Sequence, residues 1–309
     1  MYKLVIFSFV GFGAQLVDGA LGMAFGVTAT TLLVLSGLGP AHASAAVHFA
    51  EVGTTLASGI SHWRFGNVDW KMVLRLGVPG AIGAFLGATL LSNLSTEAAA
   101  PVTAGILLAI GLYVLLRFSI RPPAVAQART SPHTAKFLAP LGLFGGFIDA
   151  SGGGGWGPVS TSTLLSRGKT APRTVIGSVA ASEFLVAASA SVGFLFGLGG
   201  EFVDNLVVIA GLAIGGVLAA PVAAWLVSRI AATLLGTAVG GLIVLTNTRT
   251  LLKSFEVSGA ASSVIYLAII AAWLYFVAVA WRRSRLTEEE ASGDLTGLEA
   301  ATKDAADKA

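Results

Sequence analysis

Long runs of apolar residues dominate the chain, and short polar segments separate them. Seven of these runs are long enough to cross about 30 Å of hydrocarbon, which takes roughly 20 helical residues. They lie at 42–62, 70–92, 98–117, 172–198, 203–227, 230–248 and 261–281. Because lipid offers no hydrogen-bond partner to an open sheet edge, all of them are expected to be helices. The pattern therefore predicts an all-α, multi-pass membrane protein.

Two further apolar stretches, 4–36 and 137–166, are interrupted in the middle by glycine and aspartate. They match each other at an offset of 131 residues, and the helices that follow match at an offset of 132. The matched pairs are Asp18 with Asp149, Gly22 with Gly153, Gly26 with Gly157, Pro40 with Pro172, and Glu51 with Glu183. So many coincidences at glycine, proline and acidic positions indicate an internal repeat.

The repeat divides the chain into five parts. The expected parts are a transmembrane repeat at 1–117, a cytoplasmic linker at 118–136, a second transmembrane repeat at 137–248, an extra transmembrane helix at 249–281, and a charged, disordered cytoplasmic tail at 282–309. The apolar start of the chain resembles a signal peptide. Its recurrence in mid-chain favours a membrane segment instead.

The distribution of Lys and Arg favours a re-entrant hairpin for each interrupted stretch. With two hairpins, the basic segments at 62–75, 117–136, 167–173 and 282–285 all lie in the cytoplasm, while 92–97 and 199–204 lack Lys and Arg and lie outside. This distribution obeys the positive-inside rule, with Lys3, Arg249 and Lys253 as exceptions. Each repeat then has three crossings, so the second repeat is inverted. The alternative is nine full spans.

Four acidic residues fall well inside apolar segments: Asp18, Glu51, Asp149 and Glu183. A carboxylate at the bilayer centre costs roughly 2.5–3.5 kcal/mol on insertion scales, so intramembrane acids are usually functional. The two aspartates precede expected helix starts, where Asp is also a good N-cap. The two glutamates lie in mid-helix, where capping has no part, and we expect them to line a cavity and to exchange protons.

The run Gly152–Gly155 does not suit a helix interior, because each glycine costs about 1 kcal/mol relative to alanine. It suits a sharp turn before a half-helix that begins near Trp156, and the first repeat has an equivalent near Leu21. Two helix N-termini that face each other can bind an anion without a buried cation. The expected substrate-binding residues are Asp18, Gly19, Gly22, Met23, Asp149, Gly152, Gly153, Gly154, Gly155 and Trp156. Close helix packing is the alternative explanation for isolated glycines.

His48 lies three residues before Glu51, on the same helix face. It is a candidate for proton coupling together with Glu51 and Glu183, because histidine changes charge near neutral pH. A hydrogen-bonded core histidine is the competing interpretation, since the repeat partner of His48 is Ala180.

Composition excludes several other functions. The net charge of +3 is too small to indicate nucleic acid, and the absence of cysteine excludes disulfides and thiolate metal sites. No catalytic residue, metal or cofactor is expected. An intramembrane aspartyl protease would need Asp18 and Asp149 about 3 Å apart, as in a shared-proton dyad, and their flanking residues do not resemble such a motif.

These motifs resemble the TauE/SafE family of sulfite exporters and related permeases over about residues 1–250. The matching segments are Asp18–Gly22, Asp149–Pro158, Pro40–Glu51 and Pro172–Glu183. The resemblance implies transport of sulfite or a related sulfur-containing anion, such as a sulfonate, across a bacterial inner membrane. The first turn departs from symmetry, with Gly19-Ala-Leu-Gly22 where the second has four glycines.

Together these observations favour a secondary transporter, an exporter of a small sulfur anion, with alternating access around the two hairpins. Protons are the favoured coupling ion, and sodium stays open because half-helix ends also bind it. An anion channel on the same scaffold is the main alternative. Sequence alone leaves the exact anion, the direction of transport and the oligomeric state undetermined.

Overall fold

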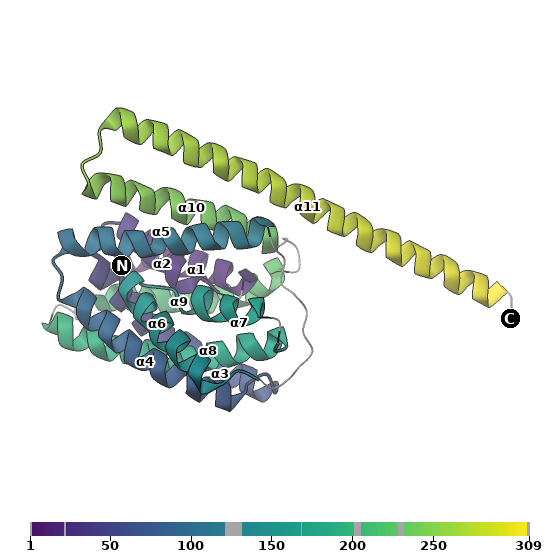
Figure 1. Ribbon diagram of the computed structural model, residues 1–309, viewed down its shortest axis with the longest axis horizontal. Helices are drawn as coiled ribbons and strands as arrows, with labels where there is room; N and C mark the ends of the chain where they lie inside the picture. Colours follow the sequence, from purple (N-terminus) through teal and green to yellow (C-terminus); the bar gives the residue numbers. More distant parts are fainter. Residues whose placement is uncertain are drawn as a thin grey trace.

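The computed structural model describes residues 2–21, 23–120, 132–167, 169–200, 205–227 and 232–307, and this part of the chain is helical without strands (Figure 1). The elements are α1 (Tyr2–Leu21), α2 (Phe25–Leu35), α3 (Pro40–Arg64), α4 (Trp70–Ser92), α5 (Thr96–Ile120), α6 (Ala135–Gly152), the π-helix η1 (Gly157–Thr161), α7 (Ser162–Ser166), α8 (Pro172–Leu198), α9 (Leu206–Val227), α10 (Ala232–Ser254) and α11 (Gly259–Asp307). The all-helical prediction is confirmed.

Five of these helices are long and apolar enough to cross a membrane. They are α4, α5, α8, α10 from Thr233, and α11 as far as Arg285. The seven predicted runs each coincide with one helix, and the bounds agree to within six residues except at the end of α11, which continues far beyond residue 281. Helix α3 has 25 residues but a lower mean hydropathy than these five, because polar side chains follow one of its faces. The chain is therefore a multi-pass membrane protein.

Both interrupted stretches form a long helix, a turn and a shorter helical segment. In the first, α1 has 20 residues and α2 has 11, and Ala24 between them has a left-handed backbone with φ of 119°. In the second, α6 ends at a left-handed Gly153 with φ of 72°, and η1 and α7 follow. Glycine adopts this conformation at little cost, whereas Ala24 does so only because its surroundings hold it there.

The long arm of each interrupted stretch packs along a helix of the other half of the chain. Helix α1 lies against α9, and α6 lies against α4. Glycines permit these close approaches, since a Cβ at Gly11 would lie 2.4 Å from the carbonyl oxygen of Leu212, and one at Gly142 would lie 2.1 Å from that of Leu76. Helix α3 packs on α8 and α5 on α10, so the two halves interlock through equivalent pairs.

The second interrupted stretch begins and ends close together. We call the end that carries Ile120 and His133, which flank the linker, the linker end. Arg167 lies over the ring of Phe137 at 3.8 Å, so α7 ends beside the start of α6 at the linker end. After α2, Gly39 lies beside Thr96 at the opposite end, which also carries the turn between α10 and α11.

Two predicted boundaries differ from the structure. Helix α10 continues to Ser254, so the boundary at residue 248 falls inside it. Helix α11 continues to Asp307 and extends well beyond the bundle (Figure 1), where a disordered tail at 282–309 was expected. Alanine, leucine and glutamate are frequent in this segment, and their helix propensity accounts for the difference. The linker segment 121–131 and Gly22 lie outside the described residues.

Candidate substrate cavity

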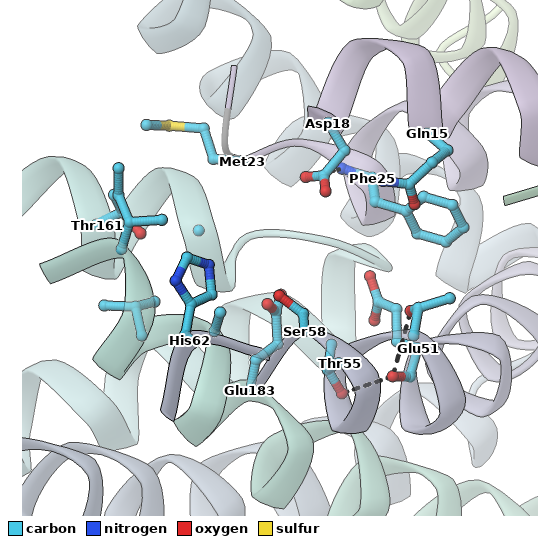
Figure 2. A pocket seen from close by; sticks show the side chains of 15 residues that line it. Gln15, Asp18, Met23, Phe25, Glu51, Thr55, Ser58, His62, Thr161 and Glu183 are labelled. Atoms are coloured by element: carbon cyan, nitrogen blue, oxygen red, sulfur yellow. Dashed lines mark hydrogen bonds between the residues drawn. The ribbon is translucent and has the colours of Figure 1, made fainter. Parts of the chain in front are cut away.

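A cavity of about 340 Å³ lies between α3, α8 and the first turn, α1–α2 (Figure 2). Its lining is Gln15, Asp18, Met23, Phe25, Glu51, Thr54, Thr55, Ser58, His62, Gly157, Thr161, Ile176, Val179, Ala180 and Glu183. It extends from Glu51 near the middle of α3 to His62 in the last turn of that helix, towards the linker end. The cavity therefore runs along α3 from the middle of the helix towards the linker end.

Three of the four expected carboxyl groups line this cavity. Glu51 is 4% exposed and projects from α3, while Glu183 is half-buried on α8. Asp18 faces them from the end of α1 (Figure 2). The described lining holds neither lysine nor arginine. Because no lysine or arginine lies beside the carboxylates, their buried negative charge must be neutralised by bound protons or by a ligand.

A polar face of α3 continues from Glu51 along the cavity. Thr55, Ser58 and His62 follow it at spacings of four, three and four residues, so their side chains share one side of the helix. The Thr55 hydroxyl donates to the Glu51 carbonyl oxygen at 2.6 Å. The sequence interpretation missed these residues, although their helical periodicity after an intramembrane acid was a usable signal.

At the first turn, Asp18 caps the second arm. Its Oδ1 accepts a hydrogen bond of 3.2 Å from the backbone N–H of Phe25, the first residue of α2. The half-helix therefore begins four residues later than expected, because α1 continues to Leu21. Met23 lines the cavity beside this turn, and Gly19 lies in the last turn of α1.

At the second turn, Asp149 makes the equivalent contact in a closed environment. Its Oδ1 accepts a hydrogen bond of 2.9 Å from the backbone N–H of Trp156, seven residues later, as Phe25 follows Asp18. Its other oxygen lies 3.1 Å from Nε2 of His48. Asp149 is 3% exposed and Trp156 is fully buried, and neither lines the cavity.

His48 therefore belongs to the second turn rather than to the cavity. Its Nδ1 lies 2.8 Å from the carbonyl oxygen of Ser44, which only accepts, so Nδ1 carries the proton. Ser44 Oγ also donates to the carbonyl oxygen of Ala150 at 2.7 Å. These bonds tie α3 to the end of α6.

The run Gly152–Gly155 packs against protein on every side. A Cβ at Gly152 would lie 2.5 Å from Ile106, and one at Gly155 would lie 3.2 Å from Ile110, both on α5. Gly153 and Gly154 have positive φ angles of 72° and 146°. The four glycines are buried and outside the cavity lining, so packing and turn geometry account for them.

The two turns touch each other directly. A Cβ at Gly154 would lie 2.1 Å from the backbone nitrogen of Val27, and one at Gly26 would lie 2.8 Å from Cα of Gly154. The Thr30 hydroxyl donates to the carbonyl oxygen of Gly153. Met23 approaches Gly157 in the same region. The turns thus meet as two backbones in contact, which a movement of either arm would have to separate.

Comparison with known proteins agrees with this description. The sequence profile of the family "Sulfite exporter TauE/SafE" matches residues 7–250. The chain is 51% identical over 274 residues to the probable membrane transporter protein YtnM of Bacillus subtilis, covering 89% of this chain and 91% of that protein. It is 28% identical over 180 residues to the probable membrane transporter protein YdhB of the same organism, covering 57% and 71%. No solved structure matches.

Proposed function

Because the chain belongs to the TauE/SafE family of sulfite exporters, we propose that it exports sulfite or a related small sulfur-containing anion as a secondary transporter. The observation that carries this proposal is the cavity, in which Asp18, Glu51 and Glu183 meet several hydroxyl groups without a lysine or arginine. A cavity of about 340 Å³ accommodates a small oxyanion and its first water molecules.

The protonation state of the carboxyl groups determines whether the cavity repels or binds an anion. Ionised, they repel an anion strongly in a medium of low dielectric constant. Protonated, they donate hydrogen bonds to its oxygens, and the hydroxyls of Ser58 and Thr161 add further donors. Substrate binding and protonation of Glu51 and Glu183 are then coupled, and anion and proton leave the cytoplasm together, driven by the outward concentration gradient of the anion.

Two inverted repeats with re-entrant hairpins supply the framework for alternating access. Equivalent packing of α1 on α9 and of α6 on α4 supports this symmetry, and the contact of Arg167 with Phe137 supports a re-entrant second stretch. The N-terminus of α2 contributes the positive end of its dipole beside the cavity. The two turns touch at Gly26 and Gly154, and this close contact supports a carrier over an open channel.

The basic side chains set the orientation in a bacterial inner membrane. Arg283 donates to the carbonyl oxygen of Ile120 at 2.8 Å, and Arg75 donates to that of His133 at 3.4 Å, so basic residues from distant segments gather at the linker end. By the positive-inside rule this end is cytoplasmic, as is the start of the tail. The cavity then faces the cytoplasm, from which an exporter takes its substrate.

Transport by the purified protein in sealed liposomes tests the proposal. Radiolabelled sulfite, thiosulfate, sulfoacetate, sulfate and acetate are compared as substrates, with protein-free liposomes as the blank. We expect saturable, protein-dependent flux of one or more sulfur oxyanions, and no flux of acetate above that of the protein-free liposomes. Equal flux of all anions, or fluxes far above roughly 10³ per second, the upper range of typical turnover numbers, would contradict a selective carrier.

A further inference from the structure

A second polar recess lies at the opposite end of the bundle from the cavity mouth. This groove of about 660 Å³ is formed by the end of α2 and the loop to α3, the first turn of α5, and the last turns of α10. Its charged lining is Arg249, Lys253, Glu97 and Glu256. The groove therefore adjoins the base of the first interrupted stretch, whose turn lines the cavity.

The two cations of the groove are placed where charge topology disfavours them. With the linker end in the cytoplasm, Arg249 and Lys253 lie on the outer side, which the positive-inside rule keeps poor in lysine and arginine. They are four residues apart on α10, so both face the same side of the helix. Two cations on one helix face that both depart from this rule suggest that their charge has a use.

The cations also recur at equivalent positions of the two halves. At the offset of 132 residues that relates Glu51 to Glu183, Arg249 corresponds to Arg117 and Lys253 to Arg121. Arg117 is in the last turn of α5, at the linker end. In sequence, each half of the chain thus carries two cations at corresponding positions near the end of α5 or α10, and Arg121 lies outside the described residues.

The charges of the groove are available to a ligand. Among the described side chains, neither Arg249 nor Lys253 lies within ion-pair distance of Glu97 or Glu256, although all four line the same recess. The first turn of α5 adds backbone N–H groups, of which that of Ala98 is satisfied by the Ser95 hydroxyl at 3.3 Å. Cations in a recess beside a helix N-terminus suit an oxyanion.

We propose that this groove binds an oxyanion through Arg249 and Lys253 and forms an outer site beside the exit of the transport path. The outer location rests on the proposed function and its orientation. The oxyanion is either the free sulfur anion that leaves the transporter or the phosphate of a phospholipid headgroup, since both present the same tetrahedral or pyramidal oxygens. Glu97 and Glu256 lower the affinity, which suits a site that must release its ligand.

Equilibrium binding to the full chain in maltoside micelles, after delipidation and at low salt, tests the groove directly. Sulfite is one probe, and a short-chain phosphatidylglycerol is the other. The test variant is Arg249→Gln/Lys253→Gln. The controls are the charge-preserving Arg249→Lys/Lys253→Arg and a variant that removes two cations at the linker end, Arg64→Gln/Lys71→Gln.

We expect the test variant to bind one or both probes about tenfold more weakly, which is the loss of about one charge-assisted hydrogen bond. Both controls should stay within about twofold. Weakening for sulfite identifies the free anion as the ligand, and weakening for the lipid alone identifies the headgroup. Equal binding of both probes by the wild type and the test variant would overturn the proposal.

Binding separates this proposal from the transport proposal. If the protein binds sulfite in the groove but transports no sulfur anion in liposomes, the proposed groove site stands and the proposed function is wrong. If the protein transports sulfite while the test variant binds both probes with wild-type affinity, the proposed function stands and the proposed groove site is wrong.

Discussion

The two turns share one construction and differ in what surrounds them. In each, an aspartate at the end of the long arm accepts a hydrogen bond from the backbone N–H seven residues later, at 3.2 Å for Asp18 and 2.9 Å for Asp149. Asp18 then faces a cavity with two glutamates, whereas Asp149 is enclosed and pairs with His48. The same local motif thus lines a cavity in the first half of the chain and joins packed helices in the second half.

A difference in the facing helix accompanies this divergence. The position on α3 that faces Asp149 is His48, and its repeat partner on α8 is Ala180, which lines the cavity near Asp18. A histidine fills the space beside one aspartate and satisfies it, while an alanine leaves space beside the other. A duplicated motif can therefore keep its fold and change its chemistry through one facing residue.

The largest expected effect comes from truncating the two aspartates. Asp149→Ala should destabilise the protein by about 3–5 kcal/mol, because it leaves His48 buried without its charged partner. Asp18→Ala should cost about 1 kcal/mol, the usual value of one cap. The difference is measured as the fraction of monodisperse protein that remains after heating in maltoside micelles. Equal losses of stability in the two variants would contradict the difference between the two turns.

The contact between the turns gives the next largest effect. Gly154→Ala should cost about 2–4 kcal/mol, since its φ of 146° is strained for alanine and its Cβ would meet the backbone of Val27. Gly53→Ala, on α3 with nothing within 4 Å of the added Cβ, is the matched control and should be neutral or slightly stabilising. Thermal denaturation of both variants decides, and a stable Gly154→Ala protein would contradict the direct contact of the turns.

A smaller loss should follow removal of the hydroxyl that joins the turns. Thr30→Val keeps the shape of the side chain but leaves the Gly153 carbonyl oxygen without this donor, at a cost of about 1–2 kcal/mol. Thr89→Val on α4, whose hydroxyl bonds only its own helix at 2.7 Å, is the control and should change stability by less than about 0.5 kcal/mol. An unchanged midpoint for Thr30→Val would show that this hydrogen bond adds little.

The cavity glutamates should contribute least to stability and most to transport. Glu51→Gln removes a buried ionisable group that has no cation beside it, so stability should stay the same or rise slightly. Its transport rate should fall and lose its dependence on pH. A variant that keeps wild-type rates across pH 5–8 would remove Glu51 from the transport step.

Much of the fold followed from the lengths of the apolar runs, and the site followed only in part. Helix α8 has the predicted bounds, because Pro172 and the glycine after Leu198 mark both ends. The prominence of Gly152–Gly155 suggested ligand contact, whereas packing against α5 and α2 explains these residues. Which turn opens onto a cavity depends on side chains from distant helices, and local sequence does not contain that information.

The most direct test is anion uptake into liposomes under an imposed pH gradient. A sulfonate is the better probe than sulfite, because the neutral acid form of sulfite crosses bilayers without protein. The account predicts that the sulfonate accumulates on the alkaline side in liposomes with the wild-type protein, and that Glu51→Gln/Glu183→Gln abolishes this accumulation. Sulfonate transport that is indifferent to the gradient in the wild type, or unchanged in the double variant, would contradict proton coupling through the cavity.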